Sequence, residues 1–136
     1  MDPARYLALF VEETSDHLDE FGRALLDLEK DPASAAALET CFRMAHSIKG
    51  MSGAMHFDAI TALAHRLEDR LDGARNAGRV DPTEVLPKLF EGLDRLERLV
   101  FAVRDTGACP EEISSSEPVN EPVLLKKKVC RKAIAA

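Results

Sequence analysis

The segment LALFVEETSDHLDEFGRALLDL, residues 7–28, predicts that this chain begins with a long amphipathic helix. Its apolar side chains recur at three- and four-residue steps, which is typical of a helix with one apolar face. Asp2 and Pro3 form a helix start, and Lys30-Asp31-Pro32 forms a stop. The apolar face, broken only at a threonine, consists of Leu7, Val11, Thr14, Leu18, Phe21, Leu25 and Leu28.

Two further helices follow with the same spacing. The first should start near Ser34 and run to about Met55, and the next should be capped by Asp58 and closed by Asn76-Ala77-Gly78. The apolar positions of the first are Cys41, Ala45, Ile48, Ser52 and Met55. Those of the next are Ile60, Leu63, Ala64, Leu67, Leu71 and Ala74.

A fourth helix should open at Asp81-Pro82, carry a kink at Pro87 in its first turn and end at Gly107. Each apolar face must be covered, and short loops force neighbouring helices to be antiparallel. We therefore predict an all-α fold, an antiparallel up-down-up-down four-helix bundle with a flexible C-terminal tail. The apolar positions of the fourth helix are Val85, Leu89, Phe90, Leu93, Leu96, Val100 and Val103.

Length and composition predict one domain in a chain of 136 residues. The bundle should occupy residues 1–107, and the Pro- and Ser-rich composition of residues 108–136 indicates a disordered linker or tail. A net charge of −6 argues against nucleic acid as a partner, and no stretch is apolar enough to insert into a membrane. Three widely spaced cysteines and no basic leader favour reduced thiols in a cytoplasmic protein.

A reactive group is indicated by the run AHSIKGMSG, residues 45–53, within the second helix. His46 and Lys49 fall on the side opposite the apolar face, so an imidazole and an ammonium share one exposed patch. Gly50 and Gly53 lie on the same side, where they clear side chains from the surface beside His46 at a cost in helix propensity. We interpret these glycines as a docking surface for another protein.

The third helix offers His46 a partner. His65 and Glu68 are three residues apart and share one face. His46 and Glu68 are about equally far from the turn at residues 56–58, so antiparallel packing brings them level. A carboxylate that accepts from Nδ1–H would fix the imidazole tautomer that leaves a nucleophilic Nε2 free, with Lys49 and His65 at its border to offset phosphoryl charge.

The run at residues 45–53 closely resembles the motif of the histidine-phosphotransfer (HPt) family, in which Lys and then Gly follow a bundle histidine. Residues 6–32 and the run His65-Arg66-Leu67-Glu68-Asp69 resemble the HPt domains of CheA-type chemotaxis histidine kinases. The resemblance covers about residues 1–107. It departs at His56, where CheA-type domains usually have glycine, so a different local turn is expected.

The resemblance implies that His46 is phosphorylated, that Glu68 orients it and that Lys49 and His65 support it. No Gly-rich nucleotide loop or Asp-rich metal cluster follows the bundle, so the chain should hold no cofactor and should not itself be an enzyme. We expect the ATP-binding domain of a histidine kinase to supply the phosphoryl group, with ATP and Mg²⁺ held by partner domains. The acceptor would be an aspartate of a response-regulator receiver domain.

Two alternatives remain open from the residues. A purely structural or adaptor bundle would use no chemistry at His46. A metal site is the other alternative, with His46, His65 and Glu68 as ligands of one zinc or iron ion. Its spacing is poor, because di-iron bundles need two Glu-x-x-His helices.

Overall fold

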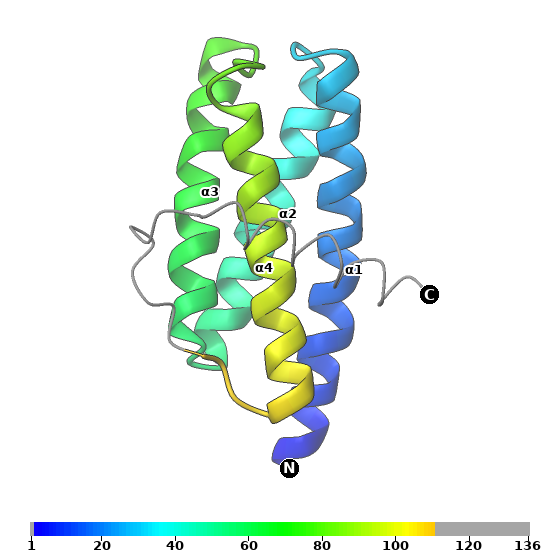
Figure 1. Ribbon diagram of the computed structural model, residues 1–136, viewed down its shortest axis with the longest axis vertical. Helices are drawn as coiled ribbons and strands as arrows, with labels where there is room; N and C mark the ends of the chain where they lie inside the picture. The colour runs from blue at the N-terminus through cyan, green and yellow to red at the C-terminus, as the bar shows by residue number, and fades with distance from the viewer. Residues whose placement is uncertain (1, 111–136) are drawn as a thin grey trace, which may run out of the picture.

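The computed structural model describes residues 2–110 and contains four helices. They are α1 (Pro3–Lys30), α2 (Ala35–Ala54), α3 (Asp58–Ala77) and α4 (Leu86–Thr106). Successive helices run in opposite directions and surround a common core, and no strand is found in the part of the chain that is described (Figure 1). The predicted all-α antiparallel bundle is thus confirmed. The predicted tail from residue 108 onward lies almost entirely outside the described residues.

The helix ends follow local chemistry. The Asp2 carboxylate accepts a hydrogen bond from the Ala4 N–H, and the Ser34 hydroxyl accepts one from the Ala37 N–H, which caps α1 and α2. Gly78 and Gly107 end α3 and α4 with φ angles of 84° and 81°, in the left-handed region that glycine tolerates best. These four ends match the sequence prediction.

Two predicted starts are wrong. Asp58 is the first residue of α3, and the cap position belongs to Phe57, which has no side-chain capping bond. Helix α4 begins at Leu86 because the Asp81 carboxylate closes a separate turn by accepting backbone N–H groups. Pro87 therefore lies in the first turn of α4, where its missing N–H costs nothing, and no kink is required.

The core contains the predicted apolar positions of all four helices, with Met55 and a few helix-end residues only half-buried. Burial, and then the negative charge of Asp27, raise the pKa of the Cys41 thiol to about 12, as befits a core residue. Gly92 allows α4 to approach α3 closely, since a Cβ there would lie 2.5 Å from a methyl carbon of Leu67. Within residues 2–110 the buried Thr14 hydroxyl finds no hydrogen-bond partner.

The turn between α2 and α3 sets which residues of the two helices come level. His56 lies in this turn with a φ of 62°, in the left-handed region where a side chain is costly. Glycine would adopt this backbone conformation at lower cost. The turn is closed by the Phe57 N–H, which donates to the Ser52 carbonyl at 2.9 Å.

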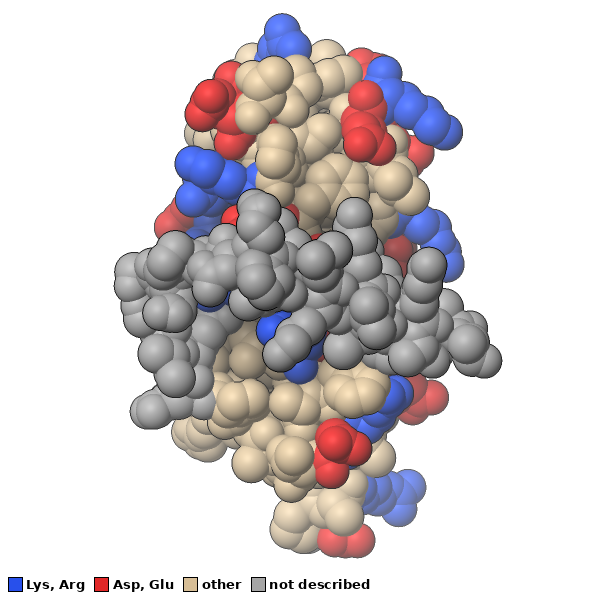
Figure 2. All heavy atoms as spheres, in the orientation of Figure 1, with Lys and Arg blue, Asp and Glu red and all other residues tan. Residues whose placement is uncertain are grey.

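The outer surface carries mixed charge. On the face shown in Figure 2, the Lys and Arg side chains of the described residues are interspersed with Asp and Glu and form no continuous basic area. None of the helices combines the length and apolarity that crossing a membrane requires, as far as the described residues extend.

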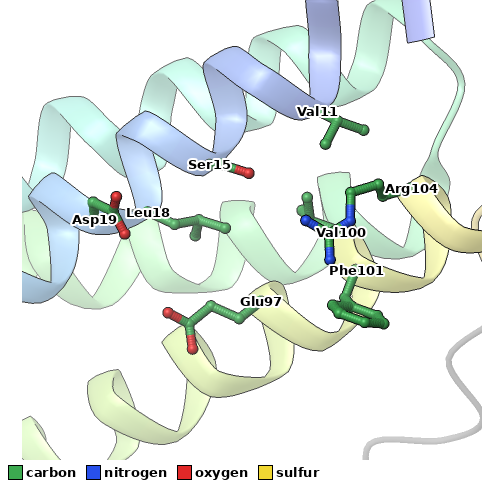
Figure 3. A pocket seen from close by; sticks show the side chains of 8 residues that line it. All are labelled: Val11, Ser15, Leu18, Asp19, Glu97, Val100, Phe101 and Arg104. Atoms are coloured by element: carbon green, nitrogen blue, oxygen red, sulfur yellow. The ribbon is translucent and has the colours of Figure 1, made fainter. Parts of the chain in front are cut away.

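A groove of about 180 Å³ lies between α1 and α4 (Figure 3). Its walls include apolar side chains, and the Arg104 guanidinium lies over the Phe101 ring at 4.6 Å from the ring centre. The groove is lined by Val11, Ser15, Leu18, Asp19, Glu97, Val100, Phe101 and Arg104.

Candidate functional site

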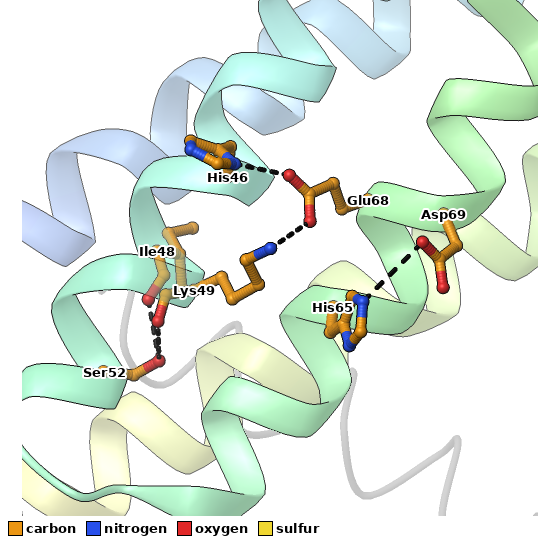
Figure 4. A network of polar contacts seen from close by, with 7 residues as sticks. All are labelled: His46, Ile48, Lys49, Ser52, His65, Glu68 and Asp69. Carbon is orange, nitrogen blue, oxygen red and sulfur yellow. Dashed lines mark hydrogen bonds and ion pairs between the residues drawn. The ribbon is translucent and has the colours of Figure 1, made fainter.

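His46 and Glu68 meet across the interface of α2 and α3 (Figure 4). The Nδ1 atom of His46 lies 2.5 Å from Oε2 of Glu68, and the carboxylate accepts the hydrogen bond from Nδ1–H. The histidine side chain is 63% exposed, whereas that of Glu68 is 10% exposed. The exposed imidazole of His46 is therefore hydrogen-bonded to the nearly buried carboxylate of Glu68.

Lys49 contacts the second oxygen of the same carboxylate. Its Nζ donates to Oε1 of Glu68 at 2.6 Å, from a side chain that is 30% exposed. Burial alone raises the pKa of the Glu68 carboxyl, but the hydrogen bonds from Lys49 and His46 and the positive charge of Lys49 outweigh it, and the pKa lies below its ordinary value of 4.5. Glu68 is thus an ionised acceptor with both oxygens engaged.

This arrangement determines what the imidazole can do. With its proton held on Nδ1 by Glu68, the neutral ring of His46 has a lone pair on Nε2. Because the side chain is mostly exposed, a second protein can approach this nitrogen. The site can therefore present a nucleophilic nitrogen at the surface.

The glycines lie as predicted on the accessible side of α2. Both are exposed, a Cβ at Gly50 would meet nothing within 4 Å, and one at Gly53 would only reach the Thr61 hydroxyl at 4.0 Å. Beneath them the buried Ser52 hydroxyl lies 2.9 Å from the Thr61 hydroxyl and donates to the Ile48 carbonyl. A surface of α2 without side chains at these two positions is therefore linked to α3 by the contact of Ser52 with Thr61.

His65 is not brought into this network. Its side chain is 60% exposed, and its Nε2 lies 3.8 Å from Oδ1 of Asp69, one turn further along α3 (Figure 4). Across residues 2–110 no group of three His, Cys, Asp or Glu side chains is placed to hold a metal ion. The ligand set considered for the metal alternative, with His65 beside His46 and Glu68, is not assembled.

Sequence reasoning missed an aromatic neighbour of His46 and the arginine that covers it. The ring of Phe42 lies parallel to the imidazole within 12°, at 6.3 Å between ring centres, and Arg75 from α3 covers the same phenyl ring. A signal for Phe42 was available, because it precedes His46 by four residues and so shares its helix face. Arg75 could be found only once the register of α2 against α3 was known.

The family and sequence comparisons agree. A family model described as the Hpt domain matches residues 5–105. The chemotaxis protein CheA of Bacillus subtilis is 40% identical over 114 residues, which cover 84% of this chain and 17% of that protein. CheA of Halobacterium salinarum is 35% identical over 111 residues, covering 82% and 17%. The chain thus spans 17% of the length of these curated relatives.

Solved structures show the same similarity. The CheA phosphotransferase domain from Thermotoga maritima superposes with a TM-score of 0.72 at 36% identity, covering 76% of this chain and 99% of that domain. A solution structure of the histidine phosphotransfer domain of CheA gives a TM-score of 0.71 at 31% identity, covering 94% and 90%. Both similarities extend over most of the bundle.

Proposed function

This chain belongs to the Hpt domain family, and within that family we propose that His46 is the residue that accepts and passes on the phosphoryl group. The chain is a phosphotransfer domain of two-component chemotaxis signalling, of the kind found in CheA. The observation that supports His46 is the hydrogen bond of its Nδ1 to the nearly buried Glu68 beneath an exposed ring.

Phosphorylation requires no proton transfer at this site. The lone pair of Nε2 attacks the γ-phosphorus of ATP held by a histidine kinase domain, the N–P bond forms, and the bond to the β-phosphate oxygen breaks so that ADP leaves with the electron pair. The ring of His46 becomes a phosphorylated imidazolium that keeps its Nδ1–H. Glu68 accepts that N–H throughout and stabilises the positive charge that develops.

In the second transfer the phosphoryl group leaves His46 for an aspartate. A carboxylate oxygen of an aspartate in a receiver domain attacks the phosphorus, the N–P bond breaks, and its electrons return to Nε2 of His46. The partners supply Mg²⁺ and the remaining catalytic groups, so this chain acts as a carrier without an ATP site of its own. Gly50 and Gly53 leave room for both partners to reach the imidazole.

The roles of Lys49 and His65 differ in this proposal. Lys49 holds the second oxygen of Glu68, which keeps the carboxyl ionised and correctly placed. His65 lies on the exposed side of α3 with its Nε2 3.8 Å from Asp69, so it supports the site without orienting His46. Removal of Lys49 should therefore cost more activity than removal of His65.

The test is phosphorylation of the His46→Gln variant by the ATP-binding domain of a CheA kinase with radiolabelled ATP. We expect an acid-labile, base-stable label on the wild type and none on the variant, with the helical content and melting temperature nearly unchanged. His17→Gln is a matched control, because the Nδ1 of His17 also donates to an oxygen, the Glu13 carbonyl at 2.8 Å. A variant at position 46 that still took the label would refute this assignment, and an unlabelled wild type would favour the adaptor alternative.

A further inference from the structure

A ring on the preceding turn of α2 stands beside the imidazole. Phe42 is half-buried, and its ring is inclined by only 12° to that of His46 with 6.3 Å between ring centres. This separation lies in the range where offset aromatic rings attract each other. The imidazole thus has a second neighbour besides Glu68.

Phe42 is itself held by the opposite helix. The Arg75 guanidinium carbon lies 3.9 Å from the centre of the phenyl ring, close enough for a cation–π interaction. An Nη1 atom of Arg75 also lies 3.7 Å from the Glu39 carboxylate, one turn before Phe42 on α2. Glu39 and Arg75 are equally far from Phe57 along the chain, as are His46 and Glu68, so both pairs belong to one register of α2 against α3.

We propose that Phe42, clamped by Arg75, is a positioning residue for phosphotransfer: it restricts the imidazole of His46 to the orientation in which Nε2 faces outward. The inference rests on the proposed function of His46. The hydrogen bond to Glu68 holds one atom of the imidazole, Nδ1, whereas the Phe42 ring lies alongside the face of the imidazole. A ring wall on the preceding turn removes part of the rotational freedom of the imidazole.

The role of Phe42 is geometric. Its phenyl ring donates no proton and carries no charge, so its effect must come from the space that it occupies beside His46. Transfer needs the Nε2 lone pair aligned with the phosphorus, and small misplacements of a reacting atom slow such reactions strongly. Phe42→Tyr keeps the ring and should transfer normally, whereas Phe42→Ala removes it.

The experiment measures the initial rate of His46 phosphorylation by a CheA ATP-binding domain, together with the side-chain rotamer of His46 from NMR couplings. For Phe42→Ala we expect a rate about 2- to 10-fold lower, as for loss of one aromatic pair, and averaged His46 couplings in place of those of one rotamer. Arg75→Gln, which leaves the phenyl ring but frees it, should show the same changes to a smaller extent.

The chain offers a matched control on α4. Phe101 is also covered by an arginine, Arg104, at 4.6 Å, but it lines the groove between α1 and α4 and has no histidine beside it. Phe101→Ala removes an equivalent ring and cation–π pair. It should leave both the phosphorylation rate and the His46 couplings unchanged.

The outcomes separate this inference from the proposed function. A Phe42→Ala protein with a normal rate and one His46 rotamer overturns the inference, and so does an equal loss in Phe101→Ala, which would indicate a general effect of stability. If Phe42→Ala does not fold, Arg75→Gln decides, and an unchanged rate with unchanged couplings in that variant overturns the inference. Labelling of His46→Gln would instead refute the proposed function.

Discussion

Two interfaces of the bundle, α2 with α3 and α1 with α4, share a pair of side chains but differ in chemistry. Each has charged side chains at its surface, and each has an arginine over a phenylalanine ring, Arg75 over Phe42 and Arg104 over Phe101. The α1–α4 interface even has a hollow, the groove in Figure 3. Only the α2–α3 interface has an exposed imidazole on a nearly buried carboxylate.

This difference shows what makes a histidine useful in a bundle. The groove between α1 and α4 has no histidine among its lining residues. An exposed histidine alone has no defined tautomer, because water satisfies either nitrogen. The combination of an exposed ring with a carboxylate held below it by Lys49 gives the ring one tautomer and leaves Nε2 accessible.

The largest effect is expected from removal of the Glu68 carboxylate. For Glu68→Ala we expect His46 phosphorylation to slow by about 10- to 100-fold without unfolding, the range typical of groups that orient a reacting histidine. NMR of the imidazole nitrogens should show a protonated Nδ1 in the wild type and a mixture favouring Nε2–H in the variant. Asp19→Ala, which removes a carboxylate from the α1–α4 groove, is the control and should change neither. A wild-type ring protonated mainly on Nε2 would contradict the arrangement.

A bulky side chain on the docking surface should slow phosphoryl transfer. Gly50→Leu should slow transfer from the kinase and to the receiver domain about 10-fold, by covering the approach to Nε2, while raising helix stability by up to about 1 kcal/mol. Gly73→Leu on α3 is matched, because a Cβ there also meets nothing within 4 Å. It should give a similar gain in stability in urea unfolding with unchanged transfer, and equal transfer by both variants would exclude Gly50 from the contact.

The two interfaces should also differ in their response to pH. The lowered pKa of Glu68 means that its ionised form is stabilised by folding, so its contribution is full above its ordinary pKa of 4.5 and is lost as the pH falls through the lower folded value. Urea unfolding should therefore find the wild type more stable than Glu68→Gln by about 1 kcal/mol at pH 6, with the gap closing as the pH falls below 4.5. A gap that widened on acidification would contradict this.

The smallest effect concerns buried hydroxyls. Ser52 at the α2–α3 interface is satisfied by Ile48 and Thr61, whereas Thr14 on α1 is fully buried with no partner. Thr14→Val should raise the free energy of unfolding by about 1 kcal/mol or less, because it removes an unsatisfied hydroxyl and keeps the shape. Ser52→Ala should lower it by a similar amount. Thermal unfolding measures both, and a destabilised Thr14→Val protein would mean that the hydroxyl finds a partner.

Much of the fold was available from the sequence. Apolar spacing of three and four residues identified four helices, and cap chemistry at Asp2, Ser34, Gly78 and Gly107 marked four of their ends. The start of α4 was predicted four residues too early, because Asp81 can cap a turn as readily as a helix and local sequence does not distinguish the two. Burial of Thr14 in an apolar pattern was predicted, but not that its hydroxyl lacks a partner.

Part of the site was also available. The sequence predicts that His46 is exposed and that Glu68 lies opposite it on α3, because both follow from the helical period and from antiparallel packing about one turn. The side-chain atoms that contact one another could be identified only in the tertiary structure. It gave the second oxygen of Glu68 to Lys49, paired His65 with Asp69 and set the Arg75 guanidinium over Phe42. Side-chain contacts between helices depend on rotation and separation of the axes to within a few ångströms, and these are fixed by packing of the whole core, which no local pattern contains.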